Sequence, residues 1–349
     1  MGIITIVGSG MMGSALAFPA GENGHEVRLV GTPLDREIIE HARKTNRHLK
    51  LDRDFPAGIQ FFQIEELDRA LEGATLVIGG VSSFGVEWFG EYVLPRIAEG
   101  TKVLTVTKGL MDTEDGQLLP YPYSWQKKLD EIGRHLILNA VGGPCTSYEL
   151  VAHDQTEVVF CGHDLQALLE IKQMLQTDYY HISLSTDVMG IESAVALKNG
   201  YALGIALTIG LNQKLFGKDS ELHFNSQAAV FGQAAKEMYA LLTAQGVTNM
   251  NNLWVGIGDL YVTVYGGRTR QVGILLGRGL NIDEAKAELN GVTLESLVVA
   301  VRVARAVRIR ASQKKLDINS FPLLMHVDDI LSNNAQADIP WESFTFVQP

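Results

Sequence analysis

The stretch Ile3-Ile4-Thr5-Ile6-Val7-Gly8-Ser9-Gly10-Met11-Met12-Gly13 decides the fold of this chain. Its first five residues are all β-branched, which is typical of a strand that is covered on both faces. The glycines behind them have the spacing GxGxxG, and Ser14 to Ala17 then open a helical pattern. A strand, a glycine turn and a helix in this order predict a dinucleotide-binding turn, with a plain strand-to-helix turn as the less favoured alternative.

The three glycines have different tasks in such a turn. Gly8 permits the tight bend, Gly10 lets the backbone approach a pyrophosphate, and Gly13 lets the helix pack closely on the strand. Backbone N–H groups at the start of the helix favour the phosphate charge. The residues expected to contact the cofactor here are Gly8, Ser9, Gly10, Met11, Met12 and Gly13.

The choice between NAD and NADP stays open in the sequence. NAD sites usually have an acid at the end of the second strand, where it binds the ribose hydroxyls, but this chain has Val30-Gly31-Thr32-Pro33. Arg28 and Arg36 are close by in sequence, and either they bind a 2′-phosphate or they are merely solvated. We therefore expect NAD(H) or NADP(H) as the cofactor.

Strand and helix patterns alternate through the first half of the chain. Further strand patterns occupy residues 26–30, 75–80, 102–107, 136–141 and 181–185, with helical patterns at 34–45 and 86–98. This alternation predicts an α/β fold with a Rossmann-type, doubly wound, mostly parallel sheet. Helical patterns alone follow, at residues 188–211, 225–245, 283–289, 293–314 and 322–331. We predict a dinucleotide-binding domain over residues 1–186 and an all-helical substrate and catalytic domain over residues 187–349.

The composition narrows the classes of partner. The chain has 349 residues and a net charge of -11, so it lacks the excess of Lys and Arg that attracts nucleic acid or an anionic membrane. Cys145 and Cys161 are too few for a disulfide framework, and no Cys/His run has the spacing of a zinc site. The apolar stretch 188–211 contains Glu192 and Lys198, which is rare in a membrane helix. We expect a cytoplasmic protein with no membrane span, no metal and no nucleic-acid partner.

Lys108 follows the fourth strand pattern, in Thr107-Lys108-Gly109-Leu110. This position is the carboxyl end of the sheet, where open α/β folds bind their ligands. Gly109 leaves space for a ligand, and Gly142-Gly143-Pro144 makes a similar break after the next strand. A lysine on the bare surface is the alternative to a lysine that faces a ligand.

Lys198 is the only lysine between Val188 and Leu211, where Ala, Leu, Val, Ile and Gly surround it. Ala194 and Ala202 share its helical face and leave room for a substrate. Desolvation there is expected to lower the pKa of the ammonium group toward the working pH, which suits a proton donor to a ketone. A lysine that reaches out to water, or that pairs with a buried carboxylate, is an equal alternative.

A polar segment follows at residues 256–270, with one carboxylate, hydroxyls, a glycine pair and two arginines. Arginine beside free backbone N–H groups is the expected cradle for a phosphate dianion. Asp259 is placed to accept a hydrogen bond from Lys198 or from a substrate hydroxyl. The alternative is a solvated loop that leads into a charged helix start.

These segments together resemble the NAD(P)-dependent glycerol-3-phosphate dehydrogenase family. The resemblance covers nearly the whole chain, and the ordered combination is far more specific than any one piece. The segments that carry it are the glycine loop, Asn46-Arg47 before Phe55-Pro56, Lys108-Gly109-Leu110, Gly143-Pro144, Ala196-Leu197-Lys198-Asn199, Gly258-Asp259-Leu260 and Gly266-Gly267-Arg268.

The resemblance implies roles for single residues. Lys198 matches the proton-transfer residue of the family, and Arg268 matches its phosphate anchor, which also approaches the cofactor. The implied catalytic residues are Lys198, Lys108, Asn199 and Asp259. The implied substrate contacts are Lys108, Gly143, Cys145, Lys198, Asp259, Thr263, Gly267, Arg268 and Thr269. Beyond the glycine loop, the implied cofactor contacts are Ser82, Lys108, Ser147, Arg268 and Asn290.

Four positions depart from the pattern of the family. Thr269 stands where Asn is usual, Cys145 where Ser is usual, and Ser82 where Pro is usual. Asn290-Gly291 replaces a Glu-Gly pair. None of these changes removes a charge that proton transfer or the phosphate anchor needs. Thr269 is a shorter hydrogen-bonding partner than Asn, however, which leaves the precise substrate open.

The residues and the resemblance together predict an oxidoreductase that interconverts sn-glycerol 3-phosphate and dihydroxyacetone phosphate. Hydride would pass between the substrate C2 and the nicotinamide, with Lys198 as proton donor and acceptor. A dehydrogenase of another phosphorylated polyol or of a hydroxy acid is the first alternative, and a non-catalytic dinucleotide sensor is the second. The expected partners are a small phosphorylated substrate and a second copy of the chain in a homodimer.

Overall fold

The structure, a computed structural model, describes residues 1–289 and 295–345, and it divides into two compact units. The first unit comprises Met1–Lys108 and Pro120–Glu192, and the second comprises Gly109–Leu119 and Ser193–Pro349. The predicted division used one boundary, between residues 186 and 187. In the structure the short segment Gly109–Leu119 belongs with the helical unit, so neither unit is one continuous stretch of chain.

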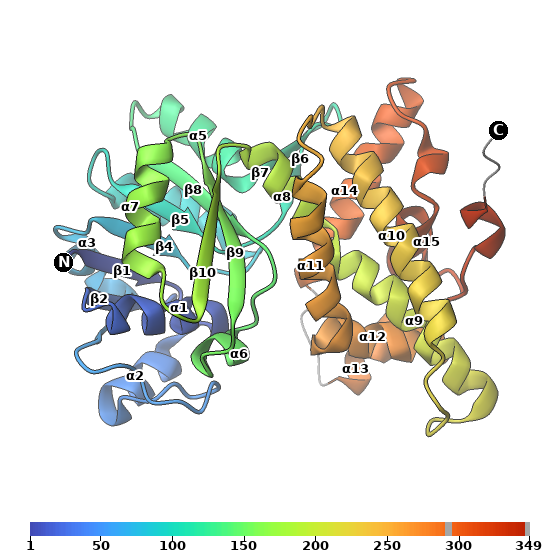
Figure 1. Cartoon of the computed structure of the whole chain (residues 1–349), viewed down its shortest axis with the longest axis horizontal. Coiled ribbons are helices and arrows are strands. Elements are labelled where there is room, and N and C mark those ends of the chain that lie inside the picture. Colours follow the sequence, from blue (N-terminus) through green and yellow to red (C-terminus); the bar gives the residue numbers. More distant parts are fainter. Residues whose placement is uncertain (290–294, 346–349) are drawn as a thin grey trace. The chain divides into compact units, whose positions relative to one another are not determined.

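The first unit is built on an eight-stranded sheet in the order β10-β9-β8-β5-β4-β1-β2-β3 (Figure 1). Every neighbouring pair is parallel except β8 and β9, which are antiparallel. The strands are β1 (Ile3–Val7), β2 (Glu26–Val30), β3 (Gln60–Phe62), β4 (Leu76–Gly79), β5 (Lys102–Thr105), β8 (Ile137–Gly142), β9 (Thr156–Gly162) and β10 (Tyr180–Ser185). The predicted fold class, a doubly wound and mostly parallel sheet, is confirmed.

Helices connect the strands and cover the sheet, as Figure 1 shows for α1 and α7. They are α1 (Met11–Glu22), α2 (Arg36–Thr45), α3 (Leu67–Leu71), α4 (Gly85–Trp88), α5 (Tyr121–Glu131), α6 (Ser147–Val151) and α7 (Leu165–Leu175). Between these layers the central strands bury Ile4, Ile6 and Ile78 completely. Burial on both faces explains why the central strands are continuous apolar runs rather than alternating ones.

Two strands of this sheet are absent from the predicted set. β3 has only three residues, too few for a recognisable period. The second residue of β9 is the exposed Glu157, which precedes its apolar run. The antiparallel pairing of β9 with β8 depends on a partner that local sequence does not specify.

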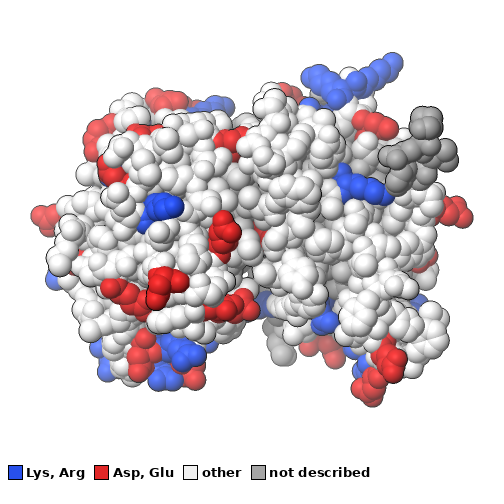
Figure 2. Space-filling model, in the orientation of Figure 1, with Lys and Arg blue, Asp and Glu red and all other residues white. Residues whose placement is uncertain are grey.

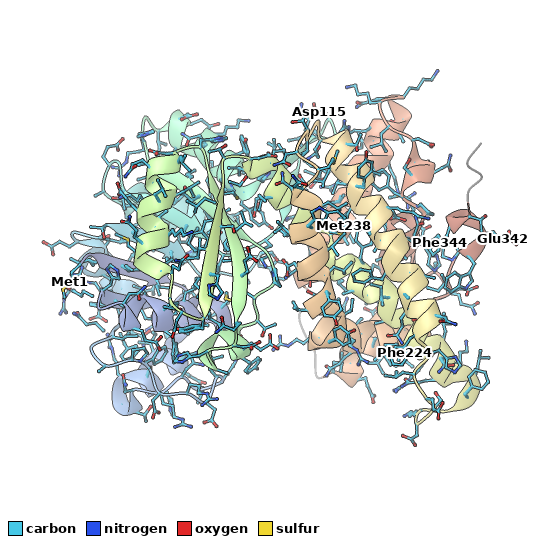
Figure 3. All side chains as sticks on the ribbon, in the orientation of Figure 1. Met1, Asp115, Phe224, Met238, Glu342 and Phe344 are labelled. Atoms are coloured by element: carbon cyan, nitrogen blue, oxygen red, sulfur yellow. The ribbon has the colours of Figure 1, made fainter. Side chains whose placement is uncertain are left out.

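The second unit is helical apart from a hairpin of β6 (Leu110–Asp112) and β7 (Leu118–Pro120). Its helices are α9 (Lys198–Phe216), α10 (Phe224–Ala244), α11 (Asn252–Tyr265), α12 (Gly267–Gly277), α13 (Ile282–Glu288), α14 (Glu295–Ser312) and α15 (Pro322–Asn333). The hairpin packs on α14, where Asp112 forms an ion pair with Arg305. Figure 3 labels Phe224 and Met238, which lie on the long helix α10.

The apolar pattern over residues 188–211 predicts one continuous helix, and this is wrong. The structure has α8 (Val188–Ala196) and α9, separated at Leu197, whose backbone leaves the regular helical angles. The whole stretch Val188–Phe216 is long and apolar enough to span a membrane, but 83% of its most apolar window is buried inside the protein. The predicted burial of this stretch in the core is therefore confirmed, although two helices form it.

The helices α11 and α12 arise from the polar, glycine-rich segment that the sequence left as either a phosphate cradle or a solvated loop. Glycine disfavours helix by about 1 kcal/mol per residue, which hides the helical pattern. The structure gives the reason for one of these glycines. A Cβ on Gly256 would lie 2.2 Å from the carbonyl oxygen of Ala194, so only glycine allows α11 this close to its neighbour.

The pair α9 and α12 shows the same close backbone approach. A Cβ on Gly273 would lie 2.6 Å from the carbonyl oxygen of Leu203, and a Cβ on Gly277 would lie 2.4 Å from that of Leu207. The contacting residue numbers rise together along both helices, so the two helices run parallel. Their N-terminal ends, at Lys198 and Gly267, therefore lie at the same end of the pair.

We predict that Gly273→Ala destabilises the protein by about 1–3 kcal/mol, because the added methyl group forces α9 and α12 apart. Gly232→Ala is the matched control. Gly232 lies inside α10, and a Cβ there would meet nothing within 4 Å, so this variant should gain up to about 1 kcal/mol from helix propensity. Urea unfolding of both variants measures the difference. Equal stabilities would show that the glycine contact is not needed.

Glu237 is a fully buried carboxyl group on α10 that holds the start of α15. Its two oxygens accept hydrogen bonds from the backbone N–H of Leu323 at 2.6 Å and of Leu324 at 2.9 Å. Gln233 donates a further hydrogen bond at 2.9 Å. Burial nevertheless raises the pKa of Glu237 from 4.5 to about 7, because the loss of water outweighs these donors.

We predict that Glu237 makes stability fall as the pH rises from 4.5 to about 7. A carboxyl group with a raised pKa in the folded state favours folding below its unfolded pKa, and this contribution is lost as the pH passes the folded pKa, by about 3 kcal/mol in total. Glu237→Gln should remove this component, so its unfolding free energy should fall less across the same range. Glu221→Gln, at an exposed position, is the control. Identical pH profiles for Glu237→Gln and the wild type would contradict the assignment.

Candidate active site

Four of the predicted site segments follow four neighbouring strands of the first unit. The strands β8, β5, β4 and β1 are adjacent and parallel, so their carboxyl ends share one edge of the sheet. Gly143, Lys108, Ser82 and the glycine loop that begins at Gly8 follow these strands in that order. The edge is where open α/β folds bind their ligands.

The glycine loop has the geometry of a phosphate-binding turn. Gly8 has a φ of +110°, and a Cβ on Gly13 would lie 2.1 Å from the Gly8 carbonyl oxygen. Gly80, after β4, also approaches closely, because its Cβ would lie 2.7 Å from the Cα of Gly13. A Cβ on Gly10, by contrast, would meet nothing within 4 Å. Gly8 and Gly13 are thus needed for packing, whereas Gly10 faces open space that a pyrophosphate fits.

The backbone of Ser9 is held through both its N–H and its carbonyl group. Its N–H donates to Oδ2 of Asp35 at 3.2 Å, and its carbonyl oxygen accepts from the hydroxyl of Ser14 at 3.0 Å. Nε2 of His48 lies 3.2 Å from the same carbonyl oxygen. Asp35 and His48 are absent from the predicted site, since isolated polar residues in loops leave no periodic signal.

The Ser9 side chain is buried, and within the described ranges its hydroxyl oxygen has no hydrogen-bond partner. Such an oxygen beside an open turn is consistent with a polar ligand that completes its bonding. The residues of the glycine loop therefore fit a dinucleotide.

The two arginines near the second strand, which are candidates for binding a 2′-phosphate, both bind other protein groups. Arg28 donates to the carbonyl oxygens of Ala70 and Glu72 and pairs with Glu26. Arg36 pairs with the carboxylate of Glu65.

Lys108 and Gly143 meet at the carboxyl ends of β5 and β8. The Lys108 ammonium group donates to the carbonyl oxygen of Gly143 at 2.5 Å. Gly143 has a φ of +112°, a conformation that favours glycine. Cys145 is half-buried just beyond this turn, and the buried Ser147 begins α6. Lys108 is thus directed at the neighbouring glycine turn rather than at bulk water.

In the second unit, Lys198 forms an ion pair with Asp259. The Lys198 ammonium nitrogen lies 2.6 Å from Oδ1 of Asp259, with side-chain exposures of 16% and 0%. This is one of the two roles expected for Asp259. It excludes a lysine that extends into bulk water, and it is the pairing with a buried carboxylate that the sequence gives as the other alternative for Lys198. The hydroxyl of Thr263 donates to the backbone carbonyl oxygen of Asp259 at 2.6 Å, one turn further along α11.

The parallel packing of α9 and α12 places further predicted residues at one end of this unit. Lys198 and Asn199 begin α9, whereas Gly267, Arg268 and Thr269 begin α12. Gly267 has a φ of +82°, and a Cβ there would meet nothing within 4 Å. The first N–H groups of a helix have no intrahelical acceptor and attract anions. This end of the helix pair therefore combines a lysine, an arginine and the N-terminus of α12, which follows the extended Gly266. Asn290, an expected cofactor contact, lies outside the described residues.

Comparisons with known proteins agree over nearly the whole chain. The family described as NAD-dependent glycerol-3-phosphate dehydrogenase matches in two parts, its N-terminus at residues 3–168 and its C-terminus at residues 187–341. The NADP(+)-dependent glycerol-3-phosphate dehydrogenase of Archaeoglobus fulgidus is 34% identical over 320 residues, which cover 90% of this chain and 93% of the relative.

Two solved structures of glycerol-3-phosphate dehydrogenases share the fold. The one from Plasmodium falciparum has a TM-score of 0.84 at 20% identity and covers 100% of this chain and 96% of its own. The one from Coxiella burnetii has a TM-score of 0.79 at 23% identity, with coverages of 98% and 97%. The resemblance predicted from the sequence is thereby confirmed, and the chain belongs to the NAD(P)-dependent glycerol-3-phosphate dehydrogenase family.

Proposed function

We propose that Lys198 transfers the proton in the NAD(P)-dependent interconversion of sn-glycerol 3-phosphate and dihydroxyacetone phosphate, the reaction of this family. The observation that carries the proposal is that the ion pair of Lys198 with the buried Asp259 lies at the same end of the α9–α12 pair as Arg268, a second cation that a purely structural ion pair would not need. Burial of a lysine in an apolar helix costs free energy, which a compensating charge offsets only in part, so a functional role is expected. Proton transfer supplies that role.

The chemistry needs one hydride and one proton at the substrate C2 and its oxygen. The bound nicotinamide supplies or accepts the hydride. In the reduction, Lys198 donates its proton to the C2 oxygen and so neutralises the alkoxide that develops there; in the oxidation, it accepts the proton of the C2 hydroxyl. Asp259 orients the ammonium group. Asn199, the next residue on α9, is proposed as a further catalytic residue on the resemblance to the family.

The substrate phosphate is assigned to the start of α12. Arg268 offers a planar guanidinium group for two parallel hydrogen bonds, and the first N–H groups of the helix add partial positive charge. The complete proposed set of substrate contacts is Lys108, Gly143, Cys145, Lys198, Asp259, Thr263, Gly267, Arg268 and Thr269.

The cofactor pyrophosphate is assigned to the glycine loop, where Gly10 faces open space. The proposed cofactor contacts are Gly8, Ser9, Gly10, Met11, Met12, Gly13, Ser82, Lys108, Ser147, Arg268 and Asn290. Either NAD(H) or NADP(H) is proposed to bind. No acid ends β2 to select the ribose hydroxyls of NAD, and Arg28 and Arg36, the candidates for a 2′-phosphate of NADP, both have protein partners. The loop residues alone would also serve a dinucleotide sensor, but a sensor has no need of the ion pair between Lys198 and Asp259.

One observation favours a related substrate as the second candidate. Thr269, which is buried at the start of α12, stands where Asn is usual in the family. Its single hydroxyl group offers a different set of hydrogen bonds from an amide. Another phosphorylated polyol therefore remains the alternative, with the same roles for Lys198 and Arg268.

We predict that Lys198→Met lowers kcat/KM with dihydroxyacetone phosphate by about a hundredfold or more, the usual scale for a lost general acid. The assay follows the absorbance of each reduced cofactor in turn. Because the single variant removes the cationic partner of the buried Asp259 carboxylate, Lys198→Met/Asp259→Asn should be equally inactive but more stable. Lys214→Met, at an exposed position on the same helix, should keep nearly wild-type activity. A folded Lys198→Met variant with nearly full activity would exclude proton transfer by Lys198.

We also propose a cytoplasmic homodimer. The support is an apolar patch around a pocket of about 310 Å³, formed by Leu222, Phe224, Phe231, Tyr261 and Tyr265. Phe224 and Tyr265 are each 67% exposed. Figure 2 shows few charged side chains over α10 and α11, so this face allows two chains of net charge -11 to approach with little repulsion.

Light scattering should accordingly give a mass about twice the 38.2 kDa of one chain. The variant Phe224→Asp/Tyr261→Asp should be monomeric, because burial of two carboxylates in the interface is unfavourable. Ile132→Asp, at an exposed apolar residue of the first unit, should remain dimeric. A monomeric wild type would contradict the homodimer, and a dimeric double variant would move the interface away from the patch.

A further inference from the structure

We propose that His48 is a positioning residue that orients the Gly10 N–H group toward the pyrophosphate of the dinucleotide. The inference rests on the proposed assignment of the cofactor to the glycine loop. His48 lies in the loop between α2 and β3, is 1% exposed, and is separated from Ser9 by 39 residues in sequence.

The partners of the imidazole ring determine which nitrogen carries the proton. Nδ1 faces two donors, the backbone N–H of Lys50 at 3.1 Å and that of Leu51 at 2.8 Å. It must therefore be the acceptor, so the proton of the neutral ring is on Nε2. Nε2 then donates to the carbonyl oxygen of Ser9, 3.2 Å away. One side chain thus holds its own loop through one nitrogen and the glycine loop through the other.

The carbonyl group of Ser9 sets the direction of the next N–H group. The Ser9–Gly10 peptide bond is trans and planar, so the Gly10 N–H points opposite to the Ser9 carbonyl oxygen. His48 and the hydroxyl of Ser14 hold this oxygen toward the protein interior. The Gly10 N–H consequently points away from His48 and Ser14. Gly10 is also the residue of the loop that faces open space. A donor aimed in advance binds a phosphate with a smaller entropic cost.

The protonation state of the His48 ring determines which of its contacts can form. Burial lowers the pKa of His48 below its ordinary value of 6.5, and Lys50 and His41 act in the same direction. The hydrogen bond to Ser9 and the charge of Asp35 act in the opposite direction. The ring is therefore neutral at neutral pH. Protonation would put a hydrogen on Nδ1 against the N–H groups of Lys50 and Leu51, so the ring would lose its contacts with its own loop, whereas Nε2 would keep its proton for Ser9.

Two substitutions at position 48 separate the contribution of Nε2 from that of Nδ1. In His48→Gln, the side-chain amide nitrogen takes the place of Nε2 and keeps the donor to Ser9. In His48→Asn, the amide oxygen takes the place of Nδ1 and keeps the acceptor for Lys50 and Leu51, but the donor to Ser9 is lost. If His48 only stabilises its own loop, cofactor affinity should be better preserved in His48→Asn. If His48 positions the glycine loop, cofactor affinity should be better preserved in His48→Gln.

The measurement is the Kd of NADH and NADPH for the full chain by calorimetry, together with KM and kcat. We expect His48→Asn to raise the cofactor Kd and KM about tenfold, the scale of one lost hydrogen bond, with little change in kcat. His48→Gln should stay within about twofold of the wild type, because it retains that bond. His181→Asn, an exposed histidine on β10, is the control.

Unchanged affinity in a folded His48→Asn variant would overturn the inference, as would a His48→Gln variant that binds as poorly as His48→Asn. Gly10→Val tests the underlying assignment separately. Its side chain meets no protein atom at the Cβ position, so the protein should fold but lose cofactor affinity. Normal affinity in Gly10→Val would remove the cofactor from the glycine loop, and the inference about His48 would fail with it.

Discussion

Direct contact between backbones, with no side chain between them, is the constraint on which both units depend. In the first unit the start of α1 packs against the turn after β4, because Gly8, Gly13 and Gly80 have no Cβ. In the second unit α12 packs against α9 through Gly273 and Gly277. The starts of α1 and α12, which are assigned to the two phosphate groups, each belong to a helix of such a closely packed pair. The first N–H groups of a helix have no intrahelical acceptor and attract anions.

The close packing of α9 and α12 also determines which charged residues of the candidate site lie at one end of the second unit. Because α9 and α12 run parallel, their first residues lie together, and Lys198 shares an end of the unit with Arg268. Asp259 then offsets one of these positive charges at 2.6 Å from within the protein. Lys108, at the sheet edge of the first unit, instead uses a backbone carbonyl oxygen as its partner. The structure thus holds each lysine in place by a different kind of acceptor, which suits different roles for the two residues.

The sequence alone predicts the parts of this structure that depend on local pattern. The β-branched run before Gly8 and the alternation of strands and helices predict the sheet, and the isolation of Lys198 in an apolar helix marks it as unusual. Pairing with β9 is not predictable in this way, because it depends on a strand elsewhere in the chain. The helix α11 is hidden by Gly256, whose purpose becomes visible only against the carbonyl oxygen of Ala194. His48 acts through one hydrogen bond across 39 residues, which no short pattern encodes.

The hairpin of β6 and β7 has a consequence for how the chain acquires its structure. Gly109–Leu119 belongs to the helical unit, so the chain crosses from one unit to the other three times. The contact of Arg305 with Asp112 spans 193 residues. A ribosome therefore releases the hairpin long before its partner helix α14 exists, and a fragment that starts at residue 193 lacks a piece of its own unit. No single cut in the chain separates the two units and leaves each of them complete. We therefore expect their coding sequences to be inherited together rather than exchanged as separate domains.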